Sequence, residues 1–131
     1  MTLSSGSYQA VSRKDWDVYL KAIGVGFDQA EEELGDFRLD VTFQDPAVTL
    51  AKVYPSRTYT QEFELGRQFR FQMPDGAQGI GMARQDGARL IQQMRGVREI
   101  TAIWKFDGDD LTETVSTDGI TATTTYQRIT T

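Results

Sequence analysis

The chain has 131 residues, no cysteine, no histidine and a net charge of −5 at pH 7. These values exclude disulfides, thiol chemistry and every catalytic arrangement that needs an imidazole base. The acidic balance, with basic residues scattered along the chain, argues against nucleic acid as a partner. No signal peptide and no membrane-spanning apolar run is evident, so we expect one domain over residues 1–131, located in the cytoplasm.

One segment near the N-terminus has a helical pattern. Ser12, followed three residues later by Asp15, predicts a helix N-cap with an acidic first turn. Apolar residues then recur at helical spacing, at Trp16, Tyr19, Leu20 and Ile23. Glycines interrupt this helix, and a second short helical piece follows over residues 28–34. We therefore expect a two-helix lid inserted after the first strand.

The rest of the chain has the pattern of β-strands. Turn signals recur at intervals of roughly ten residues, and the stretches between them are rich in Thr, Val, Ile, Phe and Tyr. With Ser7–Ser12 before the lid, the expected strands are Phe37–Gln44, Val48–Tyr54, Tyr59–Leu65, Phe69–Met73, Ala77–Gln85, Arg89–Met94, Val97–Phe106, Leu111–Thr117 and Ile120–Ile129. Because so wide an open sheet should curl or close, the sequence predicts an all-β fold, a ten-stranded antiparallel up-and-down barrel.

A barrel of this size encloses more space than its inward side chains fill, which predicts a cavity for an apolar molecule beneath the lid. The strand Ala77–Gln85 leaves one point open. Its small residues share one face, and Ile80 and Met82 share the other. If the small face points inward, the strand leaves room for cargo; if the large face does, the pocket is narrower.

Several short motifs also occur in a fixed order. Gly6-Ser7-Tyr8 precedes Trp16, and then comes the run Tyr19-Leu20-Lys21-Ala22-Ile23-Gly24-Val25-Gly26-Phe27. Further along the chain stand Phe63-Glu64-Leu65-Gly66, Asp86-Gly87-Ala88-Arg89-Leu90 and Tyr126-Gln127-Arg128. Together these motifs resemble the intracellular lipid-binding proteins, which include the fatty-acid- and retinoid-binding proteins. The resemblance implies a clam-like ten-stranded barrel with a two-helix portal, and it covers nearly the whole chain.

The chain departs from this family where members bind a carboxylate. Family members that hold a fatty acid deep in the barrel use an Arg on the eighth strand and an Arg-x-Tyr on the tenth. By the resemblance, Trp104 and Thr124 stand at the two arginine positions here, while Tyr126 is kept. The cargo is therefore expected either to be neutral or to bind with its carboxylate outward, near Arg57 at the portal.

The individual roles of these residues have alternatives. Tyr126 anchors a polar head group or is a core tyrosine, and the resemblance favours the anchor. Trp104 stacks on the cargo or only fills the volume of the absent arginine. Arg57 meets a carboxylate or is an ordinary exposed turn residue. The expected ligand-binding residues are Trp16, Tyr19, Leu20, Val25, Arg57, Phe71, Met94, Trp104, Thr124 and Tyr126.

These observations predict a monomeric carrier of a hydrophobic small molecule, such as a fatty acid, a retinoid or a similar lipid. The alternative is an enzyme or a pigment-binding protein that holds a polyene or a sterol-like ligand in the same cavity. We expect no catalytic residue, no metal ligand and no cofactor, and we interpret the acidic stretch over residues 107–110 as a plain turn. Acidic residues of the lid offset its few basic ones, so membrane contact through the lid should be transient at most.

Overall fold

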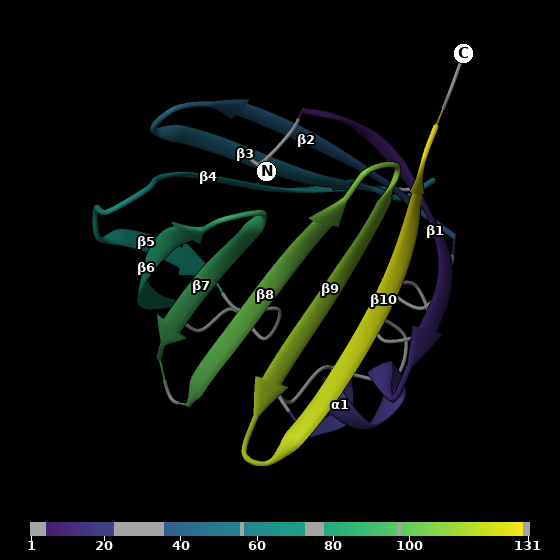
Figure 1. Ribbon diagram of the computed structural model, residues 1–131. Helices are drawn as coiled ribbons and strands as arrows, with labels where there is room; N and C mark the ends of the chain where they lie inside the picture. The colour runs from purple at the N-terminus through teal and green to yellow at the C-terminus, as the bar shows by residue number, and fades with distance from the viewer. Residues whose placement is uncertain (1–4, 23–35, 56, 73–77, 97, 130–131) are drawn as a thin grey trace.

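The structure is a computed structural model that describes residues 5–22, 36–55, 57–72, 78–96 and 98–129. Ten antiparallel strands form one curled sheet, and one short helix lies at its lower end (Figure 1). The elements are β1 (Gly6–Lys14), α1 (Trp16–Ala22), β2 (Arg38–Gln44), β3 (Ala47–Val53), β4 (Thr58–Glu64), β5 (Phe69–Gln72), β6 (Gln78–Asp86), β7 (Arg89–Arg95), β8 (Glu99–Asp107), β9 (Asp110–Thr117) and β10 (Ile120–Arg128). The predicted ten-stranded barrel is confirmed. None of the helices in the described ranges is long and apolar enough to cross a bilayer.

The strands form a meander in which the first strand, β1, also pairs with the last strand, β10. β1 pairs with both β2 and β10, so the sheet runs from β4 through β1 and β10 to β5. The remaining edges, β4 and β5, follow one another in the chain but do not share a ladder in the described sheet. Across this opening the rings of Phe63 and Phe69 stack, with centroids 5.0 Å apart. The barrel is therefore nearly closed, and side chains rather than ladder hydrogen bonds join its two edge strands, β4 and β5.

The hairpin between β9 and β10 shows how the turns follow from the sequence. Only Asp118 and Gly119 separate the strands, and both have positive φ, 50° and 78°. A two-residue hairpin that matches the twist of the sheet needs positive φ at both positions, and Asp-Gly tolerates this conformation. Asp107 and Asp110 likewise face each other across the tight hairpin between β8 and β9, so the acidic stretch over residues 107–110 is a turn.

The N-cap assigned to Ser12 is wrong. Ser12 lies within β1, where it pairs with Thr125 and its hydroxyl hydrogen-bonds the hydroxyl of that residue. The ladder to β10 continues through Lys14, so pairing with a distant strand outweighs the local capping signal. The chain turns at Asp15, which has a positive φ of 62°, and the Tyr19 amide donates to the Asp15 carbonyl at 3.1 Å. The expected second helix lies outside the described residues.

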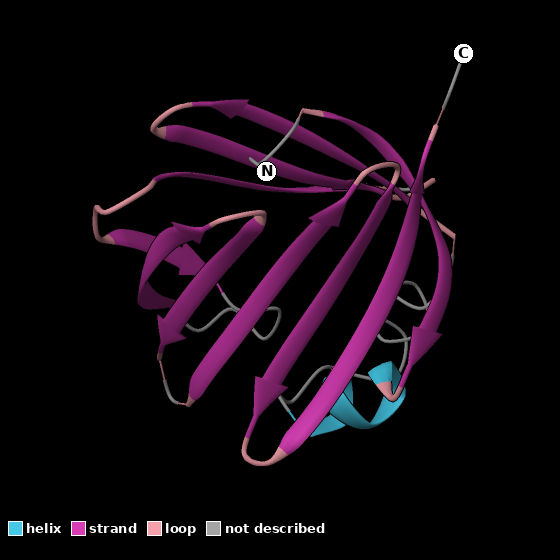
Figure 2. Cartoon of the chain, viewed as in Figure 1, coloured by secondary structure: helices cyan, strands magenta, loops and turns pink. Residues whose placement is uncertain are grey.

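The helix α1 closes one end of the barrel (Figure 2). It packs against β10 and buries Tyr19 and Leu20. At its last turn, Arg98 donates a hydrogen bond to the Ala22 carbonyl, and a basic side chain at this place stabilises a helix C-terminus. The helix is thus attached to the barrel at both ends, because it follows directly after β1 and because Arg98 holds its last turn.

The apolar core forms two clusters, one toward each end of the barrel. The first contains Tyr8, Leu39, Leu90, Phe106 and Leu111 among its buried side chains. The second lies beneath α1 and contains Tyr19, Leu20, Met94, Ile100, Ala102, Val115 and Ala122. Strand alternation produces this arrangement, because every second residue of β8, β9 and β10 is buried.

The structure decides which face of β6 points inward. Gly81 and Ala83 are buried, whereas Ile80 and Met82 are 45% and 44% exposed. The space above the glycines is already occupied, since a Cβ on Gly81 would lie 2.7 Å from Cζ of Phe69. The small inward face therefore accommodates the aromatic rings of β5 and does not enlarge the cavity.

Candidate ligand-binding cavity

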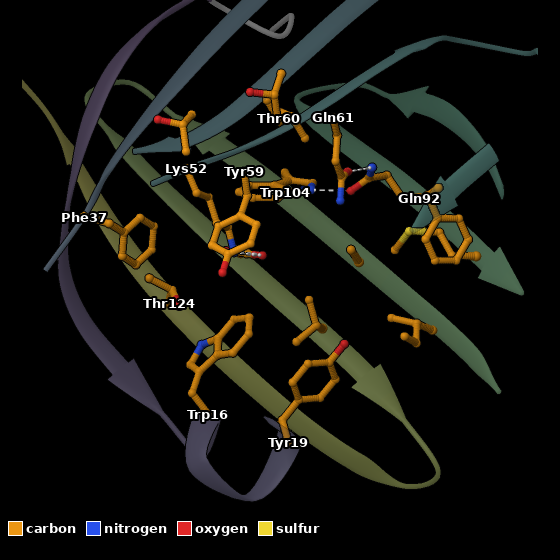
Figure 3. A pocket seen from close by; sticks show the side chains of 18 of the residues that line it. Trp16, Tyr19, Phe37, Lys52, Tyr59, Thr60, Gln61, Gln92, Trp104 and Thr124 are labelled. Carbon is orange, nitrogen blue, oxygen red and sulfur yellow. Dashed lines mark hydrogen bonds and ion pairs between the residues drawn. The ribbon is translucent and has the colours of Figure 1, made fainter. Parts of the chain in front are cut away.

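A cavity of about 730 Å³ lies inside the barrel beneath α1. Ligand pockets for small molecules span roughly 300–1,000 Å³, so this volume suits one extended lipid. The wall includes side chains from α1 and from β1, β3–β5 and β7–β10, and Figure 3 shows many of them directed into the cavity. Much of it is aromatic or aliphatic, including Trp16, Tyr19, Leu20, Phe37, Leu50, Phe69, Phe71, Met94, Ile100 and Trp104.

The structure brings most of the sequence-predicted residues to this cavity. Those on its wall are Trp16, Tyr19, Leu20, Arg57, Phe71, Met94, Trp104 and Thr124. Val25 lies outside the described residues. Tyr126 does not line the cavity. It is buried behind Glu113, which borders the cavity and accepts a hydrogen bond from the Tyr126 hydroxyl. These placements are compatible with a ligand-binding role, which remains a prediction.

An ion pair that sequence analysis missed lies in the cavity wall. Lys52 Nζ on β3 donates to Glu113 Oε2 on β9 at 3.0 Å. The side chain of Glu113 is only 3% exposed and that of Lys52 is 23% exposed. Since β3 and β9 are not neighbours in the sheet, this pair spans the interior of the barrel. Its low exposure makes the pair much more sensitive to loss of one partner than a surface salt bridge.

The second oxygen of Glu113 is also occupied. Tyr126 donates its hydroxyl to Glu113 Oε1 at 2.6 Å. Burial raises the pKa of the Tyr126 phenol well above its ordinary value, and the neighbouring Glu113 carboxylate raises that pKa further. Tyr126 therefore stays a neutral hydrogen-bond donor at physiological pH, and it holds Glu113 in a fixed orientation.

Aromatic rings surround the ammonium group of Lys52. Nζ lies 5.0 Å from the ring centre of Trp16, 5.5 Å from that of Phe37 and 5.7 Å from that of Trp104. Cation–π contacts at these distances stabilise a partly desolvated cation. Trp16 belongs to α1, so this cluster connects the lid to the charge pair inside the barrel.

A second polar chain fixes Trp104. Its indole Nε1 donates to Gln92 Oε1 at 2.8 Å, and Gln92 Nε2 donates to Gln61 Oε1 at 2.8 Å. Figure 3 shows this chain running across the cavity wall from β8 to β4. Trp104 is therefore held in place by defined partners of both its ring and its N–H group.

Two polar atoms at the cavity have no hydrogen-bond partner within the described ranges. They are the Thr124 hydroxyl oxygen and Nε1 of Trp16, both buried. Thr124 is 1% exposed, and an unsatisfied buried polar group destabilises a fold by roughly 1–3 kcal/mol. A hydroxyl that can donate or accept and an indole N–H that donates are suited to bind the polar head of a cargo molecule.

The alternation of buried and exposed residues along the strands could have indicated the two residues that sequence analysis missed. Glu113 shares a face of β9 with Leu111 and Val115, and Lys52 shares a face of β3 with Val48 and Leu50. A charged residue on the apolar face of a strand indicates a buried partner. The sequence could have revealed each charge in this way, although not that the two meet.

Arginines occupy several other positions. Arg57 is exposed at the cavity, where it donates to the Tyr59 hydroxyl at 3.2 Å. Arg128 lies at the end of β10, and it donates to Tyr8 Oη at 2.8 Å and to the Ser5 carbonyl at 3.0 Å. The described residues include no group of acidic, His or Cys side chains arranged to hold a metal ion.

Comparisons with known proteins agree with this geometry. No protein-family model matches the chain. Curated relatives are a fatty acid-binding protein of Lepidoglyphus destructor, 25% identical over 95% of this chain and 96% of that protein, and fatty acid binding protein 1-A, liver, of Danio rerio, 25% identical over 95% of this chain and 94% of that protein.

Solved structures share the fold. The fatty acid-binding protein from brain tissue of Drosophila melanogaster matches with a TM-score of 0.89 and 22% identity, over 97% of this chain and 99% of that one. A Schistosoma mansoni fatty acid binding protein in complex with arachidonic acid matches with a TM-score of 0.87 and 17% identity, over 95% of each chain. The curated relatives and these structures together confirm the resemblance to the fatty acid-binding proteins, and the structures confirm it at the level of the fold.

Proposed function

We propose that this protein is a carrier that holds one lipid molecule, a fatty acid, a retinoid or a similar compound, inside the barrel. The observation that carries the proposal is the cavity of about 730 Å³ with its aromatic and aliphatic wall. The names of the relatives support it, since these proteins are called fatty acid-binding proteins and one solved neighbour holds arachidonic acid. We infer that the whole chain acts as one monomeric binding domain in the cytoplasm, without a nucleic-acid partner.

An enzymatic role for the same cavity is not favoured. The relatives are named for binding or transport and not for a reaction. Among the described residues, Glu113 is the buried carboxylate that such an enzyme could use, but Lys52 and Tyr126 occupy its two oxygens. Both contacts restrain it as a fixed structural acceptor rather than as a mobile acid or base.

The binding experiment uses a substitution that fills the cavity. Ala102 is buried on the cavity wall, so Ala102→Leu places extra methyl groups where the cargo would lie. We expect this variant to bind oleic acid and retinol at least about tenfold more weakly than the wild type, as measured by displacement of a neutral fluorescent probe. Mass spectrometry of organic extracts of the gently purified wild-type protein identifies any cargo that co-purifies.

Ala47→Leu is the matched control, because it makes the same change at an exposed position on β3. This control should bind both lipids as the wild type does. A wild-type protein that binds neither lipid and releases none on extraction would contradict the carrier function.

Cargo transfer to membranes should depend little on lipid charge. The end of β1 and the lid offer Lys14 and Lys21 to a membrane, whereas Arg13 is half-buried on the cavity wall, and acidic residues at positions 15, 17, 28 and 31–33 offset the two lysines. Attraction to an anionic surface amounts to about 1 kcal/mol per basic residue, so little net attraction remains. The transfer rate of a fluorescent fatty acid to vesicles should therefore stay nearly constant as phosphatidylserine is added. A steep rise that disappears in Lys14→Gln would show collisional transfer instead.

A further inference from the structure

A charge pair formed by Lys52 and Glu113 lies inside the barrel on the cavity wall. A fatty acid is an anion at neutral pH, and burying its carboxylate requires a cation that is available to pair with it. Among the described residues, Lys52 is the lysine that lines the cavity, and it already pairs with Glu113 at 3.0 Å. A cargo carboxylate beside Lys52 would therefore face a second carboxylate across the same ammonium group.

Glu113 has no easy way to leave this position. It is 3% exposed, and the Tyr126 hydroxyl holds its other oxygen at 2.6 Å. Rotation of the carboxylate away from Lys52 would break one charge-assisted hydrogen bond and strain the other. An incoming anion thus meets a competitor that the fold keeps in place.

Two uncharged polar atoms on the cavity wall are available to a cargo. Thr124 Oγ1 and Trp16 Nε1 are buried on the cavity wall and have no hydrogen-bond partner among the residues described. Trp16 and Lys52 lie against one another, with Nζ 5.0 Å from the indole ring, and Figure 3 shows both side chains directed into the cavity. An alcohol or an aldehyde could accept from the indole N–H, and an alcohol could also donate to the threonine hydroxyl.

Arginines on the wall offer a carboxylate other positions. Arg57 and Arg70 are exposed, where water weakens any ion pair, and the exposed Glu62 borders the same side of the cavity. Arg13 is half-buried, with its guanidinium 5.4 Å from the ring centre of Phe37. An acid bound at Arg57 or Arg70, in contact with water, would respond little to the charge of Glu113, so this arrangement can be distinguished by experiment.

We propose that Glu113 is a specificity-determining residue that competes with the cargo for Lys52, so that the cavity prefers lipids with an uncharged polar head, such as a long-chain alcohol or aldehyde, over the corresponding ionised acid. This inference rests on the proposed carrier function and specifies its cargo. It predicts that removing the charge of Glu113 converts the site into one that prefers acids.

The test compares oleic acid with oleyl alcohol, which share one hydrocarbon chain, by displacement of the neutral probe Nile red at pH 7.4. The wild type should bind the alcohol at least as tightly as the acid. Glu113→Gln keeps the shape and leaves Lys52 unpaired, and an opposite charge at this range favours the ionised form by about tenfold or more. The acid should therefore gain about tenfold or more in affinity relative to the alcohol.

Glu64→Gln is the matched control, since it removes the same unit of charge from an exposed position of β4 that does not line the cavity. Its ratio of acid to alcohol affinity should equal that of the wild type. The alcohol also serves as an internal control, because a general loosening of the cavity would change both affinities together.

Three results would overturn the proposal. One is a wild type that binds the acid about tenfold or more tighter than the alcohol, a measurement that does not require the variant to fold. The second is an unchanged affinity ratio in Glu113→Gln, and the third is the same change in ratio in Glu64→Gln. If neither lipid displaces the probe from the wild type, the carrier function itself fails, which is a separate outcome.

Discussion

Replacing Lys52 with methionine should lower the free energy of unfolding by about 3–5 kcal/mol, the loss that follows when one partner of a buried ion pair is removed. Methionine has nearly the same length as the lysine stem, so the packing against Trp16, Phe37 and Trp104 is largely retained. What remains is the carboxylate of Glu113, 3% exposed and without its cation. Urea denaturation with linear extrapolation measures the difference.

Two further variants separate the charge effect from other causes. Lys105→Met makes the same substitution at an exposed position of β8 and should change stability by no more than about 0.5 kcal/mol. The double variant Lys52→Met/Glu113→Gln removes both charges and should recover most of the lost stability, because an uncharged pair avoids the burial of a lone ion. A loss below about 1 kcal/mol in Lys52→Met would show that the pair behaves as a surface salt bridge.

The sequence was sufficient to predict the strands because each carries its own signals. The expected strand Arg89–Met94 corresponds to β7 (Arg89–Arg95), and the expected strand Leu111–Thr117 corresponds to β9 (Asp110–Thr117). Asp-Gly turns and alternating apolar residues are local features, so they can be found without knowledge of the fold. The N-cap assigned to Ser12 failed for the opposite reason. Its partner Thr125 is 113 residues away, and a local pattern contains no information about that ladder.

The cavity wall was predictable as far as the family resemblance extends. It directed attention to Trp104 and Thr124, and the structure places both on the wall. The charge pair could not be found in this way, because the resemblance implies arginines at other positions. Lys52 and Glu113 are 61 residues apart on strands that are not adjacent, so their contact exists only when the barrel is closed. The sequence also could not predict which face of β6 points inward, because the rings of Phe69 and Phe71, which cover its glycines, come from another strand.

Replacing Trp104 with alanine should have the second large effect, a loss of about 3–5 kcal/mol in stability. The indole is 3% exposed, it lies 6.3 Å from the ring of Tyr126, and it forms one side of the aromatic surroundings of Lys52. Its removal leaves a void and also leaves the Gln92 oxygen without its 2.8 Å donor. Because Trp104 borders the cavity, the affinity for oleyl alcohol should also fall by about tenfold or more.

Trp104→Phe distinguishes the contribution of the ring from that of the N–H group. Phenylalanine keeps an aromatic wall but cannot donate to Gln92, so it should lose about 1–3 kcal/mol of stability and retain most of the affinity for the alcohol. Tyr126→Phe removes a single hydrogen bond to Glu113 and should reduce lipid affinity less than Trp104→Ala does. Urea denaturation and displacement of Nile red measure the two quantities on the same samples. If Trp104→Ala binds the alcohol as tightly as the wild type, the cargo does not pack against this wall, and the head group must lie elsewhere in the barrel.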